Sequence, residues 1–256
     1  MKVLAVGDIV GKTGLQKLKE VLPSIIKNDQ INFIIVNGEN AADGMGLTEK
    51  MYKDMLALNV NVVTMGNHTW GKKEIFQFIN DKHIIRPANY SDNNPGRGYD
   101  IYECNGKRIG VINLIGRTSM NVLSDNPFTV INDILEDLKG KTDIIFVDFH
   151  AEATAEKIAM AYYLDGRVTA VFGTHTHVQT ADETILEKGT AYITDIGMTG
   201  PKKSVIGMDV EVSIKRFETS LPEKYKVAED SGKLNGCVFE IDDNTNKVTK
   251  IYRIQK

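Results

Sequence analysis

The chain has 256 residues, of which 42% are hydrophobic and 25% are charged, and its formal net charge at pH 7 is -3. This balance is typical of a folded globular protein and excludes a disordered chain. The sequence has no apolar run long enough to span a bilayer and no segment rich in lysine and arginine. We therefore expect neither a membrane nor duplex nucleic acid as a partner.

The cysteines indicate the compartment. Cys104 and Cys237 stand alone, without the spacing of a disulfide framework or a thiolate metal site. The apolar run at the start of the sequence is too short for a secretory signal. A reducing compartment, the cytoplasm, is therefore predicted. Because no linker or internal repeat interrupts the sequence, we also expect a single domain over residues 1–256.

Short runs rich in β-branched residues alternate with helical patterns along the chain, which is typical of strands joined by crossover helices. The runs predict strands at residues 2–7, 31–37, 60–65, 107–114, 143–149, 168–173 and 190–194. Apolar residues at helical spacing predict helices over 15–26 and 130–138. The late stretch CVFEIDDNTNKVTKIYRI alternates around turn residues and predicts a hairpin. The sequence therefore predicts an α/β fold in which an antiparallel piece joins a largely parallel sheet.

Five of the predicted strands end abruptly in polar residues. These segments read LAVGD, IIVNGEN, VVTMGNH, IIFVDFH and AVFGTHTH, and they contain four of the five histidines. Ligands of open α/β sheets bind at the carboxyl ends of the strands. We therefore expect the five endings to converge on one site.

The converging side chains offer carboxylate, amide and imidazole donors. The expected metal ligands are Asp8, Glu39, Asn40, Asn67, His150, His175 and His177. Such donors without cysteine suit two divalent ions, Fe(II) or Mn(II) in preference to Zn(II). A carboxylate that bridges two ions lets them share a hydroxide, and Glu39 is the candidate bridge. His68 directly follows a predicted ligand, and we interpret it as the general acid or as a donor to the phosphate.

The ordered set GD, GEN, GNH, FH and GTHTH resembles the calcineurin-like metallophosphoesterases, and the longer segments GDIVGK, GNHTW, DFHAEAT and GTHTHVQTAD are similar to their YmdB-like branch. The resemblance implies a four-layer αββα sandwich with mixed sheets. It implies that one metal is held by Asp8, Glu39, Asn40 and His177, and the other by Glu39, Asn67, His150 and His175. It also implies hydrolysis of a small-molecule phosphodiester, a cyclic nucleotide and above all a 2',3'-cyclic one, by a metal-bridging hydroxide with His68 as acid.

The first motif departs from the broad family. Most members have Asp-x-His there, whereas this chain has Asp8-Ile9-Val10, so one ligand of the first metal is missing. Glu39 stands where the family usually has an aspartate, and the adjacent Asn40 can replace the lost histidine.

Several other motifs have ordinary interpretations. The segment 7–13 is one residue too short for a P-loop, which we reject. Arg117 either pairs with a phosphate or is simply exposed, and Glu152 either orients a metal-bound histidine or begins a helix. His83 is interpreted as a surface or strand-entry residue. The glycine-rich run 195–204 is interpreted as a mobile wall of the site or a plain surface loop.

Two alternative functions stay open. The same metals would serve a phosphomonoesterase or a protein phosphatase, and a nucleotide-sensing regulatory module with slow turnover would use the same site differently. The sequence does not identify the preferred base or the isomer released. It also leaves open whether the chain forms a homo-oligomer.

Overall fold

The apolar runs form two six-stranded sheets in the computed structural model, which describes residues 1–256. The strands of the first sheet are β1 (Lys2–Val6), β3 (Phe33–Asn37), β4 (Val62–Thr64), β5 (Ile84–Ile85), β14 (Asn235–Ile241) and β15 (Val248–Gln255). Their order is β15-β14-β1-β3-β4-β5. From β1 to β5 the strands are parallel, and the β14–β15 hairpin lies antiparallel beside β1.

The second sheet is also mixed. Its strands are β6 (Tyr99–Cys104), β7 (Lys107–Ile115), β8 (Ile144–His150), β9 (Ala170–Thr174), β10 (Thr184–Ile185) and β11 (Ala191–Ile193). In the order β10-β11-β9-β8-β7-β6, the four central strands are parallel and the two edge strands are antiparallel to their neighbours. A small third sheet joins β2 (Asp8–Ile9), β12 (Met198–Pro201) and β13 (Gly232–Lys233).

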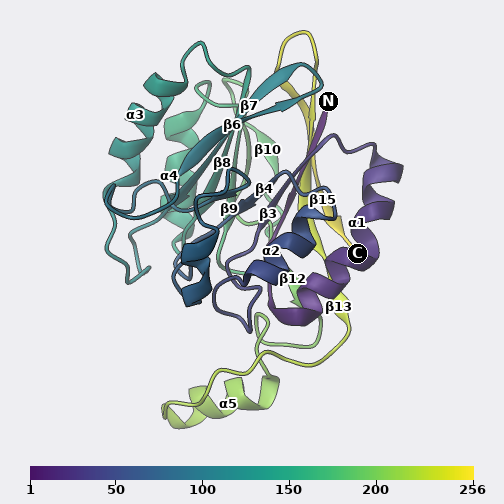
Figure 1. Ribbon diagram of the computed structural model, residues 1–256, viewed down its shortest axis with the longest axis vertical. Coiled ribbons are helices and arrows are strands. Elements are labelled where there is room, and N and C mark those ends of the chain that lie inside the picture. The colour runs from purple at the N-terminus through teal and green to yellow at the C-terminus, as the bar shows by residue number, and fades with distance from the viewer.

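Helices cover the outer faces of both large sheets. The helical elements are α1 (Gly11–Asp29), α2 (Glu49–Leu56), the short 3-10 helix η1 (Lys73–Gln77), α3 (Pro127–Leu138), α4 (Thr154–Leu164) and α5 (Val210–Thr219). Figure 1 shows α1 on one side of the strands and α3 and α4 on the other. The predicted four-layer sandwich with mixed sheets is thus confirmed.

Alternate residues of each central strand enter different cores. In β1, Leu4 and Val6 belong to the core that also contains Leu18 of α1. Val3, which precedes Leu4 and points the other way, belongs to the core between the sheets together with Phe146 of β8. Because both faces of these strands are covered, their sequences are mainly apolar and do not alternate regularly with polar residues.

The predicted strands are confirmed with boundaries shifted by two residues or fewer, and the late hairpin is confirmed as β14 and β15. The helices are longer than predicted, since α1 begins at Gly11 and α3 at Pro127. The interpretation of 195–204 as a mobile wall or surface loop was wrong. Residues 198–201 form β12, which is buried and pairs in parallel with β2. The four residues MTGP are too few to show a period, and their glycine and proline are typical of turns.

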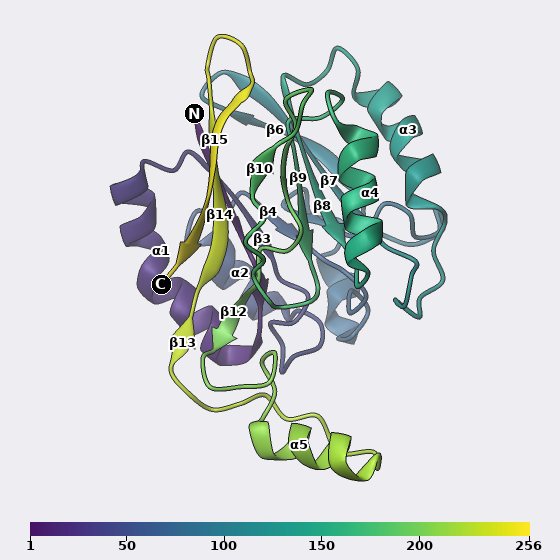
Figure 2. The ribbon, with the colours of Figure 1, turned by 180° about the vertical axis from the view of Figure 1, so that it is seen from behind.

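One element stands apart from the four layers. Figures 1 and 2 show α5 projecting beyond the sheets on a long excursion between β12 and β13. None of its residues is buried, and the side chain of Phe217 is 81% exposed. Its first turn is capped by Asp209, whose carboxylate accepts a hydrogen bond from the Val212 amide at 3.0 Å.

Cys104 and Cys237 are both free thiols. Among the helices, none combines the length and the apolar character needed to cross a membrane.

Candidate metal centre

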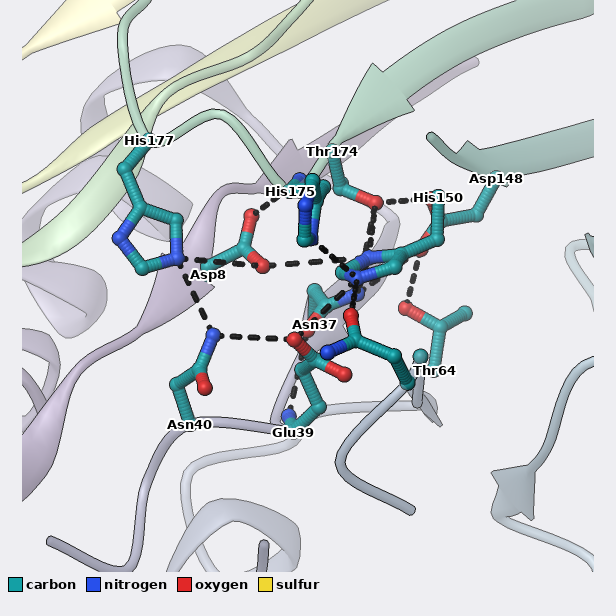
Figure 3. A network of polar contacts seen from close by, with 12 residues as sticks. Asp8, Asn37, Glu39, Asn40, Thr64, Asp148, His150, Thr174, His175 and His177 are labelled. Carbon is teal, nitrogen blue, oxygen red and sulfur yellow. Dashed lines mark hydrogen bonds and ion pairs between the residues drawn. The ribbon is translucent and has the colours of Figure 1, made fainter. Parts of the chain in front are cut away.

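Strand ends from both large sheets meet at one place (Figure 3). The structure brings together there all seven predicted ligands and His68: Asp8 in β2, Glu39 and Asn40 after β3, Asn67 and His68 after β4, His150 at the end of β8, and His175 and His177 after β9. Chain segments more than 160 residues apart therefore contribute to one cluster. Asp8, Glu39 and His150 are completely buried within it.

Gly66 allows the backbone to lie close to two side chains of the cluster. A Cβ atom at this position would lie 2.4 Å from Glu39 Oε2 and 2.4 Å from His150 Nε2. Any side chain would therefore push these two groups apart, and only glycine allows the backbone to approach them so closely. The glycine of the GNH motif thus has a steric role.

The first group of candidate metal ligands surrounds His150 Nε2. This nitrogen lies 2.9 Å from Asn67 Oδ1, 3.2 Å from Glu39 Oε1 and 3.1 Å from His175 Nδ1. One imidazole nitrogen carries at most one proton, so it cannot satisfy three acceptors at once. Donor atoms of Glu39, His150 and His175 lie within 4.8 Å of one another, a spacing at which they could hold a metal ion.

The second group of candidate metal ligands lies beside the first. His177 Nε2 is 3.1 Å from Asn40 Nδ2 and 3.8 Å from Asp8 Oδ1. Asp8 Oδ1 is buried and has no hydrogen-bond partner. Glu39 connects the two groups, because its Oε1 accepts a hydrogen bond from Asn40 Nδ2 at 3.0 Å.

Each imidazole of the two groups has an acceptor on its outer nitrogen. His150 Nδ1 lies 2.9 Å from Thr174 Oγ1, and His177 Nδ1 lies 2.7 Å from the carbonyl oxygen of Ile206. His175 Nε2 lies 3.1 Å from Glu152 Oε2. A proton held on each outer nitrogen leaves a lone pair on His150 Nε2, His177 Nε2 and His175 Nδ1, and these three atoms face the cluster.

A buried carboxylate continues the chain of contacts behind His150. The Thr174 hydroxyl donates to Asp148 Oδ1 at 2.7 Å, and the Thr64 hydroxyl donates to Asp148 Oδ2. Asn37 Nδ2 lies 3.4 Å from Asp148 Oδ2 (Figure 3). Because Thr174 gives its own proton to Asp148, its oxygen is left to accept from His150 Nδ1. This network therefore selects the tautomer of His150.

The charges of the cluster are compensated only by imidazoles, since no lysine or arginine pairs with Asp8 or Glu39. Burial acts to lower the pKa of His150, but the carboxylates of Glu39 and Asp8 outweigh burial and raise it to about 9. Burial acts to raise the pKa of Glu39, but His150 and His68 hold it well below its usual range. Burial raises the pKa of Asp8, although His177 partly offsets this. The pocket is thus electrostatically suited to cations.

Comparisons with known proteins agree with this arrangement. Residues 4–254 match the family model described as YmdB-like protein. The chain belongs to the YmdB-like family. It is 51% identical to the 2',3'-cyclic-nucleotide 2'-phosphodiesterase of Bacillus subtilis (strain 168), over 99% of this chain and 96% of that protein. The predicted resemblance to this branch is therefore confirmed.

Solved structures support the same family and fold. A novel phosphatase from Mycoplasma pneumoniae has a TM-score of 0.95 and 41% identity, covering 100% of this chain and 93% of that one. A hypothetical protein from Thermus thermophilus has a TM-score of 0.94 and 38% identity, covering 100% and 99%. A putative 5'-nucleotidase from Staphylococcus aureus shares the fold alone, with a TM-score of 0.63 and 15% identity over 99% of this chain and 53% of that one.

Asn40 of this YmdB-like chain takes an orientation that the sequence does not predict. Its Nδ2 faces Glu39 and His177, and its Oδ1 lies 2.8 Å from His68 Nδ1. A metal ligand must present the oxygen. Rotating the amide by 180° exchanges the two atoms without moving the backbone.

Other residues that the sequence singled out lie outside the cluster. The Arg117 side chain is exposed, and only its backbone amide is bonded, to Glu156. His83 directly precedes β5 and contacts the Asn61 carbonyl, so its interpretation as a strand-entry residue is confirmed. Glu152 does contact a histidine of the cluster, although this is His175 and not the nearby His150.

Sequence reasoning did not identify the residues that support the cluster from behind. These are Asn37, Thr64, Asp148 and Thr174. Each is a polar residue within or at the end of a mainly apolar and largely buried strand, and that contrast is the signal by which they could have been found.

Proposed function

We propose that this YmdB-like chain is a dinuclear-metal phosphodiesterase that hydrolyses 2',3'-cyclic nucleotides. The observation that carries the proposal is the position of Glu39. Its Oε1 lies 3.2 Å from His150 Nε2 in one donor group and 3.0 Å from Asn40 Nδ2 in the other. A shared carboxylate between two donor groups is the arrangement that two bridged cations require. The name of the Bacillus relative supports the substrate class.

The residues fit two divalent ions. Asp8 Oδ1 is a buried carboxylate oxygen with no hydrogen-bond partner, and His150 Nε2 faces three acceptors, so both atoms would gain from a cation. One ion would be held by Asp8, Glu39, Asn40 and His177. The other would be held by Glu39, Asn67, His150 and His175.

The donor set also bears on the choice of metal. Two carboxylates and two amides among seven ligands, with no thiolate, favour Fe(II) or Mn(II) over Zn(II). Bound divalent ions would lower the pKa of a water molecule so that it loses a proton and becomes a nucleophile at neutral pH, and they would neutralise charge on the phosphate.

His68 is suited to protonate the leaving group. Its side chain is 31% exposed, and its Nδ1 faces Asn40 Oδ1 at 2.8 Å. The backbone amide of His68 donates to Glu39 Oε2 at 2.9 Å, which fixes the residue against the cluster. Nε2 has no partner within the protein and is free to meet a substrate. When the phosphorus–oxygen bond breaks, the departing ribose oxygen takes the proton from His68 Nε2.

We further propose that the 2' ester bond is the one cleaved, so that the product is a nucleoside 3'-phosphate. The name of the Bacillus relative specifies a 2'-phosphodiesterase. We place the reaction in the cytoplasm, which two free thiols support.

The test is a set of turnover measurements on protein purified without oxygen and loaded with Mn(II). Hydrolysis of 2',3'-cyclic AMP is followed by chromatography that separates the 2'- and 3'-phosphates. We expect metal-dependent formation of the 3' isomer. Asn67→Ala should abolish turnover, and His68→Ala should lower kcat by about 10²- to 10⁴-fold while both metals stay bound. His83→Gln, a histidine outside the cluster, serves as the matched control and should leave kcat unchanged.

Other outcomes would select a different function. Faster hydrolysis of phosphomonoesters than of the cyclic diester would favour a phosphatase, which is how the Mycoplasma relative of known structure is described. Tight binding of the cyclic nucleotide combined with slow turnover, with two metals bound, would favour a nucleotide-sensing role. Stoichiometric zinc after anaerobic purification would overturn the choice of metal.

A further inference from the structure

Two predicted metal ligands have an unfavourable backbone conformation. His175 has a φ of 97° and His177 a φ of 65°, in the left-handed region that side chains with a Cβ rarely occupy. They flank Thr176, and the turn directs both imidazoles into the cluster, one toward each donor group. Such strain persists only where surrounding contacts hold the backbone in place.

A buried ion pair makes these contacts. Lys157 of α4 is 1% exposed and Asp195, just after β11, is fully buried. Lys157 Nζ donates to Asp195 Oδ2 at 2.7 Å and to the Thr174 carbonyl oxygen at 2.8 Å. Asp195 Oδ2 also accepts from the backbone amide and the hydroxyl of Thr176, at 3.1 and 2.7 Å. The pair thus binds the chain on both sides of His175.

The remaining contacts anchor the pair to the end of the second sheet. Asp195 Oδ1 accepts from the Gly197 amide at 2.8 Å. At Gly173, a Cβ would lie 1.8 Å from the Thr194 carbonyl oxygen, so β9 and the segment after β11 are pressed together where the turn begins. The turn is therefore bonded to a rigid part of the sheet.

General stability is a poor explanation for this pair. Burying two charges costs desolvation energy, and apolar side chains of similar size often stabilise a core equally well. Four hydrogen bonds of the pair end on Thr174, Thr176 and Gly197, and none ends on a side chain of a predicted ligand. These four hydrogen bonds therefore hold the backbone around Thr174 and Thr176 in place.

We infer that Lys157 and Asp195 are positioning residues for the metal centre. They hold residues 174–177 in the strained turn, so that His175 and His177 reach the two metals at the same time. The inference rests on the proposed function, which identifies the bound groups as two divalent metal ions. We therefore expect one support, which bonds to no side chain of a predicted ligand, to control the affinity of both metal sites.

The test compares Asp195→Asn with Lys157→Met by two measurements that need no turnover. One is equilibrium dialysis against Mn(II), and the other is hydrogen–deuterium exchange of residues 174–180 in the metal-free protein. We expect Asp195→Asn to raise the Kd of both sites at least tenfold and to speed exchange in this segment. Lys157→Met should have a smaller effect, because Asp195 still holds Thr176. Met160→Ala, buried on the same helix but outside the turn, should lower the melting temperature without changing either readout.

Equal Kd values and equal exchange in Asp195→Asn and the wild type would overturn the inference. If Asp195→Asn fails to fold, Thr176→Val removes one hydrogen bond to Asp195 at a partly exposed position, and Thr176→Ser should restore metal affinity. If the wild type binds no metal, the proposed function fails. Exchange in the metal-free protein still decides whether the pair holds the turn.

Discussion

Three histidines of the cluster each have an acceptor on the ring nitrogen that points away from the cluster, and these contacts favour one tautomer of each ring. Thr174, Glu152 and the Ile206 carbonyl each bind an outer imidazole nitrogen. The support differs in exposure, because Thr174 is fully buried whereas the Glu152 side chain is 51% exposed. Water competes for an exposed contact but not for a buried one. Loss of the Thr174 contact should therefore weaken metal binding more than loss of the Glu152 contact.

Thr174→Val is expected to weaken metal binding by about 10- to 100-fold, the usual effect of removing a partner that orients a ligand. The methyl group keeps the volume but leaves His150 Nδ1 without an acceptor, and Asp148 loses a donor. Equilibrium dialysis against Mn(II) measures the change. Thr174→Ser retains the hydroxyl and should bind as the wild type does.

Glu152→Gln is expected to change metal affinity less than Thr174→Val does. The amide oxygen can still accept from His175 Nε2, and water can replace it at this exposed position. The same dialysis applies to both variants. An effect of Glu152→Gln larger than that of Thr174→Val would show that burial does not decide the strength of these contacts.

The clustering of the candidate ligands could be predicted from the sequence because they follow apolar runs at strand ends. Asp148 and Asp195 could not be assigned roles in the same way. Asp148 lies inside the run that ends in His150, and Asp195 follows a run that supplies no predicted ligand. Their function depends on contacts with Thr174 and Thr176, which only the three-dimensional arrangement establishes.

Among the elements, β14 comes late in the chain but contributes to the core that joins the two large sheets. It lies between β1 and β15, and Phe239 from it reaches the core between the two large sheets. The ring of Phe239 lies 5.3 Å from that of Phe146, edge to face, and 6.2 Å from that of Phe172. One side chain of the hairpin thus connects the first sheet to β8 and β9, the strands that lead to three histidines of the cluster.

Phe239→Ala is expected to lower the free energy of unfolding by about 3–5 kcal/mol, because it leaves a cavity between the sheets. Urea denaturation followed by circular dichroism measures the loss. Phe217→Ala, on the exposed face of α5, removes the same atoms and should change the free energy of unfolding by less than about 0.5 kcal/mol. Equal losses of unfolding free energy in both variants would show that the packing of Phe239 between the sheets does not contribute to stability as we expect.

Strands that lie in apolar runs were predictable, whereas the two-residue strands and the edge strand β6 were not. The run before Asn37 is apolar on both faces and bounded by turn residues, which made β3 evident. The edge strand β6 reads YDIYEC, with no buried face that would give a clean alternation. For β5, β10 and β13, two residues are too few to carry any period.

For the whole molecule, we propose that the single domain expected from the sequence unfolds as one unit. The core between the sheets joins both halves of the sandwich, so separating the sheets would expose the inner face of each one. Thermal unfolding of the metal-free protein should give one transition, with coincident midpoints by near- and far-ultraviolet circular dichroism. Two separated transitions would contradict a single domain.

Metal binding should stabilise the folded chain, because the donors come from strands of both sheets. At a free concentration 100 times the Kd, one bound ion adds about 2.7 kcal/mol, which for a chain of this size raises Tm by roughly 5–10 °C. Calorimetry with Mn(II) and with a chelator measures the difference. The Asn67→Ala variant should lose the part of this increase that comes from the site containing Asn67, whereas His83→Gln should retain all of it.

The position of β14 also affects the synthesis of the protein. Val3 in β1 pairs with Phe239, so nearly the whole chain is translated before this neighbour exists. At about 5–20 residues per second, the delay is on the order of ten to fifty seconds. A nascent chain that has not reached β14 already contains every predicted ligand, but β1 still has an unpaired edge. Such edges pair readily with strands of other molecules, so a ribosome that stalls in this interval would leave a product prone to aggregation.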